Sequence, residues 1–190
     1  DDAGTTRIRE YFGSSVFEFT LKDAIDRGFL CHYRYLPHLV ELSGSELQLY
    51  GEITKKIQVR FARSKGDASE DPAVRRLLEQ RANILNHAAK KLEVLETLLS
   101  GRKDLRYALF YCAPGGSQLD DTLALLGRHD IVSARFTQEE DLQKRQSLLA
   151  NFGAGKFHAL VAMRCLDEGV DVPATREAFI LASSTNPIQF

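Results

Sequence analysis

A regular alternation of short apolar runs and helical segments after residue 105 constrains the fold most strongly. Four apolar runs have the length of strands: Leu105–Cys112, Ile131–Phe136, Phe157–Met163 and Ala178–Ala182. Helical patterns of about ten residues separate them, at Leu119–Leu126 and Glu139–Phe152. Strands that alternate with helices form right-handed crossovers, which join parallel strands. The sequence therefore predicts an α/β fold, with a parallel sheet flanked by helices.

The first fifty residues predict a mixed segment of strands and short helices. Helices are expected at residues 5–13 and at Leu21–Arg27, and strands at Val16–Thr20 and Phe29–Tyr35. A further helix is expected to begin at Ser43 or Ser45 and to run through Ile57. Glu46 stands three residues after Ser43, which is the spacing of a capping box.

A long amphipathic helix is expected to begin at Pro72, a residue that suits the first position of a helix. Apolar residues step by four and three from Val74 to Leu99, and a break is expected near Asn83–Asn86. Arg81 interrupts this apolar stripe. A snorkelling or paired arginine is favoured over a phosphate or inter-domain contact.

Charge is distributed unevenly along a chain that is almost neutral overall. The 190 residues hold 25 Lys and Arg against 26 Asp and Glu, a formal net charge of −1, which excludes a strongly basic nucleic-acid binder. Residues 53–106 hold 13 basic and 7 acidic residues (+6), and the remainder holds 12 and 19 (−7). The basic segment is either an electrostatic footprint for phosphate or a solvated helix face of mixed charge.

The cysteines and histidines predict neither a disulfide framework nor a metal site. Three cysteines lie far apart, at positions 31, 112 and 165, and are expected in the core of a protein from a reducing compartment. Cys31 and His32 would point to opposite faces of a strand and would not act together. The five histidines show no metal-ligand spacing. With no apolar run long enough for a membrane span and no signal peptide, the expected location is the cytoplasm, the nucleoid or the nucleus.

Two short segments resemble nucleotide-binding motifs but fail on context. Gly153–Lys156 looks like the end of a P-loop, yet Phe157 follows the lysine and a helix precedes the loop, so a plain turn is expected. Asp167-Glu168 looks like a magnesium-binding box, yet the acids stand four residues beyond the strand that ends at Met163. A metal role for them is rejected.

Three blocks in order carry a family resemblance. The first is the strand up to Cys112 with Ala113-Pro-Gly-Gly, the second runs from Ala134 to Lys156, and the third is Leu160–Pro173 with Glu168-Gly-Val-Asp-Val-Pro. This series resembles the second RecA-like domain of superfamily 2 helicases, with the blocks corresponding to motif IV, the helix before motif V, and motif V. The N-terminal phrases resemble the branch of DNA-repair helicases, restriction translocases and phage-defence helicases.

The resemblance implies two groups of site residues. Nucleic-acid backbone contacts are implied for Ala113, Pro114, Gly115, Thr137, Met163, Arg164 and Cys165. A role at the ATP cleft is implied for Glu168, Gly169 and Asp171. Met163 and Arg164 depart from the Thr-Asp of the best-known relatives, and Arg164 suits a phosphate contact.

The resemblance also implies a larger enzyme. ATP and Mg²⁺ would be held mainly by a first RecA-like domain, and the catalytic arginines of motif VI would follow beyond Phe190. The chain is expected to be truncated and inactive on its own as an ATP hydrolase. Its expected parts are a linker segment with the first strands and helices (1–50), a basic helical insertion (51–104) and the RecA-like core (105–190).

The expected function is that of the second motor domain of a helicase or translocase. Its partners would be nucleic acid, DNA more than RNA, the first RecA-like domain, and subunits of a repair, restriction or antiviral defence complex, with no membrane. One alternative is a non-catalytic interaction module that keeps the helicase fold. An independent nucleotide-binding enzyme is disfavoured because no glycine-rich phosphate loop follows any expected strand.

Overall fold

The computed structural model describes residues 3–13, 17, 19–63, 71–163, 172 and 174–182. The chain divides into two compact units, Asp1–His38 and Leu39–Phe190. Each unit is described by itself. Within the described ranges, no helix combines the length and the apolar character needed to cross a bilayer.

The N-terminal unit contains two helices, α1 (Ala3–Phe12) and α2 (Leu21–Asp26). Thr20 caps α2 with a capping box. The backbone N–H of Asp23 donates to the Thr20 hydroxyl at 3.1 Å, and the Thr20 N–H donates to the Asp23 carboxylate at 3.0 Å. Hydrogen bonds from Thr20 hold the pKa of Asp23 below its usual value. Both predicted helices are thus confirmed.

The two strands expected in this unit are not formed in its described residues. Residues 17, 19 and 20 lie outside any strand, and the chain from Phe29 to Tyr35 bends at Phe29 and Leu30 and then has no regular secondary structure. Phe17 and Phe29 are each 73% exposed, so no neighbouring strand covers the apolar side chains that suggested strands. Cys31 is exposed as well, which corrects its expected place in the core.

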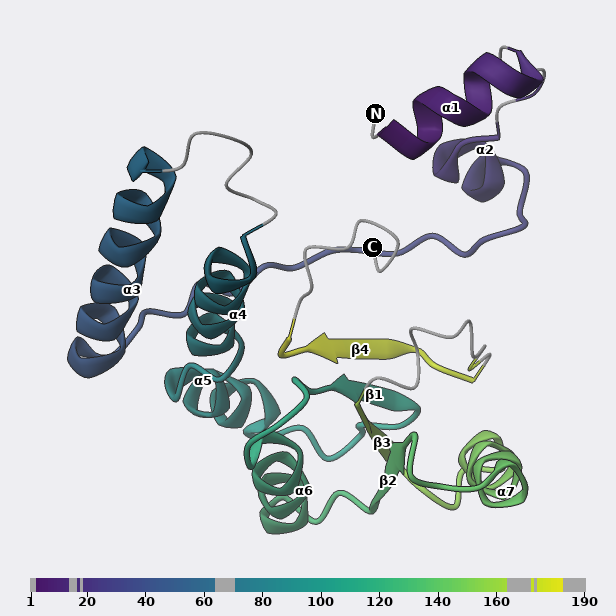
Figure 1. Ribbon diagram of the computed structural model, residues 1–190. Coiled ribbons are helices and arrows are strands. Elements are labelled where there is room, and N and C mark those ends of the chain that lie inside the picture. The colour runs from purple at the N-terminus through teal and green to yellow at the C-terminus, as the bar shows by residue number, and fades with distance from the viewer. Residues whose placement is uncertain are drawn as a thin grey trace. The chain divides into compact units, whose positions relative to one another are not determined.

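The C-terminal unit begins with three helices, α3 (Gly44–Arg63), α4 (Pro72–Asn86) and α5 (Lys90–Leu99), shown in Figure 1. The predicted capping box starts α3. The Ser43 N–H donates to the Glu46 carboxylate at 2.7 Å, and the Glu46 N–H donates to the Ser43 hydroxyl at 3.3 Å. The helix continues beyond the expected end at Ile57. The expected break in the long helix is confirmed, displaced to residues 87–89.

Apolar contacts and one stacked arginine hold α3 against α4. Ile53 and Ile57 of α3 are buried, and Val74 of α4 is fully buried. The guanidinium of Arg81 lies over the ring of Tyr50, 5.6 Å from its centroid. Arg81 is therefore a paired arginine, as favoured from the sequence, because a cation over an aromatic face is electrostatically attracted.

The sheet is parallel throughout, in the strand order β2-β3-β1-β4. Its strands confirm the four predicted positions: β1 (Ala108–Tyr111), β2 (Ser133–Thr137), β3 (Ala159–Met163) and β4 (Glu177–Ile180). Two helices connect them, α6 (Gln118–Arg128) and α7 (Leu142–Gly153), as expected. The predicted RecA-like α/β architecture is confirmed.

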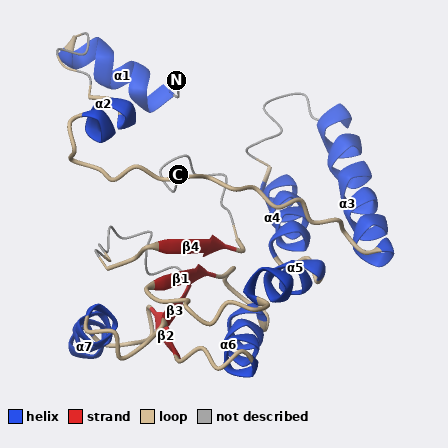
Figure 2. Cartoon of the chain, turned by 180° about the vertical axis from the view of Figure 1, so that it is seen from behind, coloured by secondary structure: helices blue, strands red, loops and turns tan. Residues whose placement is uncertain are grey.

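Helices cover both faces of the sheet (Figure 2). Ala108 and Phe110 of β1 face a core shared with α5 and α6, whereas Leu109 faces a second core shared with Phe152 of α7. Successive side chains of a strand point to opposite faces, so a strand buried on both faces needs an unbroken apolar run. This explains why the sequence of β1 and β3 is apolar without alternation.

Phe110 provides a direct test of the core beneath α6. Its side chain is fully buried and stacks on Phe179 with ring centroids 4.6 Å apart. We expect Phe110→Ala to lower the free energy of unfolding by about 3–5 kcal/mol through lost burial and a residual cavity. Chemical denaturation followed by circular dichroism measures this.

The matched control is Phe61→Ala, because Phe61 on α3 is 47% exposed. It removes the same atoms and should cost less than about 1.5 kcal/mol, since much less apolar surface is returned to water. Equal losses for the two variants would contradict the packing described for β1.

Candidate functional site

The carboxyl ends of β2, β3 and β1 bring three of the predicted nucleic-acid residues to one edge of the sheet. Thr137 at the end of β2 is in register with Met163 at the end of β3. The N–H of Cys112 donates to the carbonyl of Ala162 at 2.8 Å, so Ala113 follows directly beside that point. In open α/β sheets, this edge is where ligands bind.

The other predicted site residues in this region are placed unevenly. Pro114 and Gly115 lie in the loop that follows β1, with Gly115 exposed. Five predicted residues lie outside the described part of the chain: Arg164, Cys165, Glu168, Gly169 and Asp171.

A buried glutamine fixes the loop after β1. The N–H of Ala113 donates to the side-chain oxygen of Gln118 at 2.7 Å, and the Gln118 amide nitrogen donates to the carbonyl of Asn86 at 2.9 Å. Ala113 is 1% exposed and Gln118 is 5% exposed. Because unpaired buried polar groups are costly, this side chain holds the loop and the end of α4 together.

His87, which lies just after α4, packs against the same loop. His87 Nε2 is 3.2 Å from the carbonyl oxygen of Pro114, which accepts a hydrogen bond when Nε2 carries the proton. Gly116 has φ +68°, and a Cβ there would stand 3.3 Å from two ring atoms of His87. Glycine is thus required both by the backbone conformation and by the ring packed on it.

A half-buried lysine joins the end of β4 to the same junction. Lys91 Nζ donates to the carbonyl of Leu181 at 2.5 Å and to the carbonyl of Asn86 at 3.2 Å. Burial lowers the pKa of Lys91, because an ammonium group loses hydration there. The Asn86 carbonyl therefore receives hydrogen bonds from both Lys91 and Gln118.

Sequence reasoning missed this junction, which consists of Asn86, His87, Lys91 and Gln118. Gln118 bonds to Asn86 across 32 positions, and Lys91 bonds to Leu181 across 90. No local periodicity encodes such pairs. The one available signal was the helix break itself, since a break exposes backbone carbonyls that need donors.

Thr137 is engaged within its own loop. Its N–H and its hydroxyl both donate to one carboxylate oxygen of Glu140, at 2.6 and 2.8 Å, and both residues are buried. Arg145 Nε donates to the Glu140 carbonyl at 2.9 Å. The hydroxyl predicted to contact a nucleic-acid backbone thus shapes the turn between β2 and α7.

The first turn of α6 carries acids that offset the positive end of the helix. Asp120 forms an ion pair with Arg135, and the hydroxyl of Ser117 donates to Asp121 at 2.6 Å. Carboxylates at this position satisfy the helix dipole and compete with an incoming anion. Any phosphate contact at this loop would therefore fall on the exposed glycines rather than on the end of the helix.

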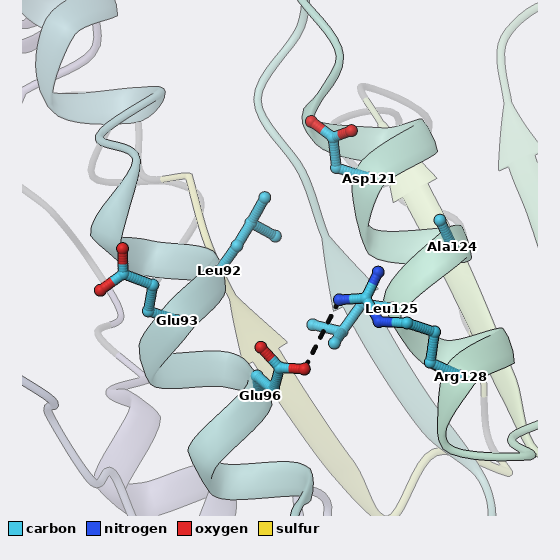
Figure 3. Close-up of a pocket in the computed structure, with 7 residues that line it drawn as sticks. All are labelled: Leu92, Glu93, Glu96, Asp121, Ala124, Leu125 and Arg128. Atoms are coloured by element: carbon cyan, nitrogen blue, oxygen red, sulfur yellow. Dashed lines mark ion pairs between the residues drawn. The ribbon is translucent and has the colours of Figure 1, made fainter.

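A small hollow of about 240 Å³ between α5 and α6 is acidic (Figure 3). Glu93 and Glu96 of α5 and Asp121 and Arg128 of α6 line it, a net charge of −2 from three carboxylates and one guanidinium. Arg128 pairs with Glu96 at 3.5 Å. Like-charge repulsion makes this hollow unsuited to phosphate.

Cys112, which follows β1, and Gly155, which follows α7, have structural roles. Burial raises the pKa of the Cys112 thiol to about 11, so the thiol stays protonated near neutral pH and unreactive.

Gly155 has φ +73° and follows the end of α7. Its N–H donates to the carbonyl of Phe152, and the N–H of Lys156 donates to the carbonyl of Asn151. This is a Schellman helix end, which confirms that Gly153–Lys156 is a plain turn.

Gln118→Leu tests the junction with little change in side-chain volume. It leaves the buried Ala113 N–H without its acceptor and removes one donor from the Asn86 carbonyl. We expect the free energy of unfolding to fall by about 2 kcal/mol, the cost of an unsatisfied buried donor.

Gln143→Leu on the exposed face of α7 is the control. An exposed substitution of this kind should change stability by less than about 0.5 kcal/mol. Urea denaturation measures the free energy of unfolding of both variants. A Gln118→Leu variant as stable as the control would refute the role of the junction.

Comparison with known proteins shows which folds this chain resembles. No protein-family model matches the sequence. The DNA 3'-5' translocase XPB2 of Sulfurisphaera tokodaii is 24% identical over 179 residues, covering 85% of this chain and 39% of the relative. This chain thus spans about two fifths of the length of that relative.

Among solved structures, the C-terminal domain of a SWI2/SNF2 ATPase from Sulfolobus solfataricus is similar, with a TM-score of 0.55 at 8% identity. The match covers 74% of this chain and 68% of that one. The Hef helicase domain of Pyrococcus furiosus aligns with a TM-score of 0.43 and 19% identity, over 76% and 30% of the two chains. The predicted resemblance to the second RecA-like domain of superfamily 2 is confirmed at the level of the fold.

Proposed function

On the premise of a fold shared with the C-terminal RecA-like domain of superfamily 2 motors, we propose that this chain serves as the second motor domain of an ATP-dependent DNA helicase or translocase. One observation carries the proposal: Ala113, Thr137 and Met163, chosen from sequence motifs, belong to neighbouring strand ends of one sheet edge. The similarity to a protein named as a DNA translocase favours DNA over RNA.

The loop after β1 is the first proposed contact with the nucleic-acid backbone. Gly115 and Gly116 are exposed, and both have positive φ angles, +80° and +68°. Residues without a Cβ let a phosphate approach the backbone closely. Contacts of this kind read no base edges, so the grip would be independent of sequence, as a translocating motor needs. Thr137 and Glu140 would hold the neighbouring loop in place.

Arg164 and Cys165 complete the proposed backbone contacts beside Met163. Arg164 follows β3 directly in the sequence and offers a guanidinium for a charge-assisted hydrogen bond to phosphate. This part of the proposal rests on the sequence motif alone.

The ATP side of the proposal rests on Glu168, Gly169 and Asp171. When bound, ATP with Mg²⁺ would supply the free energy of phosphoryl transfer, and a first RecA-like domain would hold most of its ligands. Across the described residues, no group of three or more His, Cys, Asp or Glu side chains could hold a metal ion. The contribution proposed for this chain is to orient groups on one side of the cleft.

The proposed setting is intracellular nucleic-acid metabolism in a reducing compartment. The partners would be DNA, the first RecA-like domain, and subunits of a repair, restriction or phage-defence complex. The protonated, buried thiol of Cys112 is compatible with such a compartment.

Asp171→Asn tests the proposed motor role in a full-length protein that contains this chain together with a first RecA-like domain and the motif VI arginines. We expect DNA-stimulated ATP hydrolysis to fall by about 10²-fold, as for removal of a preorganised electrostatic group. A steady-state ATPase assay at saturating single-stranded DNA measures the effect.

Asp130→Asn is the control, since it makes the same chemical change at an exposed residue with φ +55°, a conformation that asparagine tolerates. Its turnover should match that of the unmodified protein. Unchanged turnover in Asp171→Asn would refute the cleft assignment. A protein with DNA binding but no hydrolysis at all would point instead to a non-catalytic module.

A further inference from the structure

A basic groove lies between α3 and α4, lined by residues other than the proposed contacts at the carboxyl edge of the sheet. It encloses about 810 Å³. The two helices lie side by side in both views (Figures 1 and 2). Its charged lining residues are Lys55, Lys56, Arg60, Arg63, Arg76 and Asp71. Among the described lining residues, five cations against one carboxylate give a net charge of +4, in a chain whose overall charge is −1.

The single acid among the described lining residues, Asp71, already has two partners. One carboxylate oxygen of Asp71 accepts a hydrogen bond from the N–H of Ala73 at 2.8 Å and so caps α4. The other oxygen lies 3.4 Å from Arg60. Lys56, Arg63 and Arg76 have no such partner among the described ion pairs and remain exposed at the surface. The described lining of the groove therefore carries more positive than negative charge.

Helix geometry lines up the cations on α3. Lys56, Arg60 and Arg63 follow one another at spacings of four and three, which places them on one face of the helix. The distance from Lys56 to Arg63 along the axis is about 10 Å. That is the rise of about three nucleotides in one strand of a duplex. Val59 and Leu77 are apolar members of the same lining, where long cationic side chains can lay their aliphatic stems.

The chemistry of the lining selects the backbone of a nucleic acid rather than its bases. None of the residues that line the groove is aromatic, whereas sites that hold single strands rely on stacking against aromatic rings. The lining also lacks Asn, and its one amide, Gln80, stands among cations. Rows of exposed lysine and arginine neutralise phosphates without reading sequence. The acidic hollow between α5 and α6 has the opposite charge (Figure 3).

We infer that the α3–α4 groove is a second nucleic-acid site, which binds the phosphate backbone of a DNA duplex independently of the carboxyl edge of the sheet. The inference rests on the proposed function for its choice of ligand. The far end of α4 carries Asn86, which bonds to Gln118 beside the loop at 113–116. A duplex in the groove would thus contact α4, the helix whose end is hydrogen-bonded to Gln118 beside the proposed contact at 113–116.

The test measures binding of a fluorescein-labelled 20-base-pair DNA duplex to the 190-residue chain by fluorescence anisotropy, over a series of salt concentrations. The groove variant combines Lys56→Gln, Arg63→Gln and Arg76→Gln, leaving the Arg60–Asp71 pair intact. Each lost phosphate contact should flatten the plot of log K against log salt by about 0.9. The groove variant should therefore flatten it by about 2–3 and weaken binding at least about tenfold near physiological salt.

Two matched variants control for net charge and for folding. Arg7→Gln, Lys22→Gln and Arg34→Gln remove the same charges from exposed positions in the N-terminal unit, and should leave the slope close to that of the unmodified chain. Lys56→Arg, Arg63→Lys and Arg76→Lys keep the groove positive and should retain the slope. Equal slopes for the groove variant and the N-terminal variant would overturn the inference.

Further outcomes separate this inference from the proposed function. Gly115→Asp places a carboxylate on the exposed loop of the carboxyl edge. If Gly115→Asp abolishes duplex binding while the groove variant does not, the groove is refuted and the edge survives. If the unmodified chain binds no duplex but binds a single-stranded oligonucleotide, the groove is refuted and the edge survives. If it binds neither, both are refuted. Displacement of the duplex by poly-glutamate at equal charge concentration would show a general polyanion surface and refute a nucleic-acid site.

Discussion

The parallel pairing of β3 with both β1 and β2 is the constraint on which the rest of the structure depends. Parallel strands must all end at the same edge, so each loop that follows a strand meets the others there. Because helices cover both faces, the central strands have no solvated side and must be apolar throughout. Ala113, Thr137 and Met163 are neighbours for this reason, although 50 positions separate Ala113 from Met163.

Hydrogen bonds at the junction between α4 and α5 fix the loop after β1 and the end of β4 at that edge. Gln118, Lys91 and His87 satisfy carbonyls of Asn86, Leu181 and Pro114, three groups that helix ends and loops would otherwise leave without donors. A lysine with a lowered pKa is an expensive group to use, since its charge loses hydration. Its two carbonyl acceptors offset that cost. The helical segment that precedes the sheet is thereby tied to the candidate site.

The sequence predicted the elements whose signals are local. The apolar runs at 105–112 and 157–163, the capping box at Ser43 and the helix end at Gly155 all depend on residues close together in the chain, and all are confirmed. It failed for Phe29–Tyr35, where an alternating or apolar pattern met no partner strand. It could not find Gln118 or Lys91, because their partners lie far along the chain. Thr137 was chosen for the right edge, but its bond to Glu140 is visible only in three dimensions.

The charge pattern was visible in the sequence, but its spatial arrangement was not. The excess of basic residues over 53–106 is a property of composition, and it left both a phosphate footprint and a solvated face open, with the solvated face favoured. Packing of α3 on α4 gathers five of those cations around one groove and leaves two acids of α5 at another hollow. Charge alone does not decide function, but its arrangement restricts the ligands that fit.

Hydrogen–deuterium exchange of the chain, with and without a single-stranded DNA oligonucleotide, tests the central claim most directly. Binding at the carboxyl edge of the sheet predicts slower exchange in peptides that cover 112–118 and 137–142, with peptides from the amino ends of the strands unchanged. Saturating DNA that leaves both edge peptides unprotected, or that protects only the amino ends, would contradict the account.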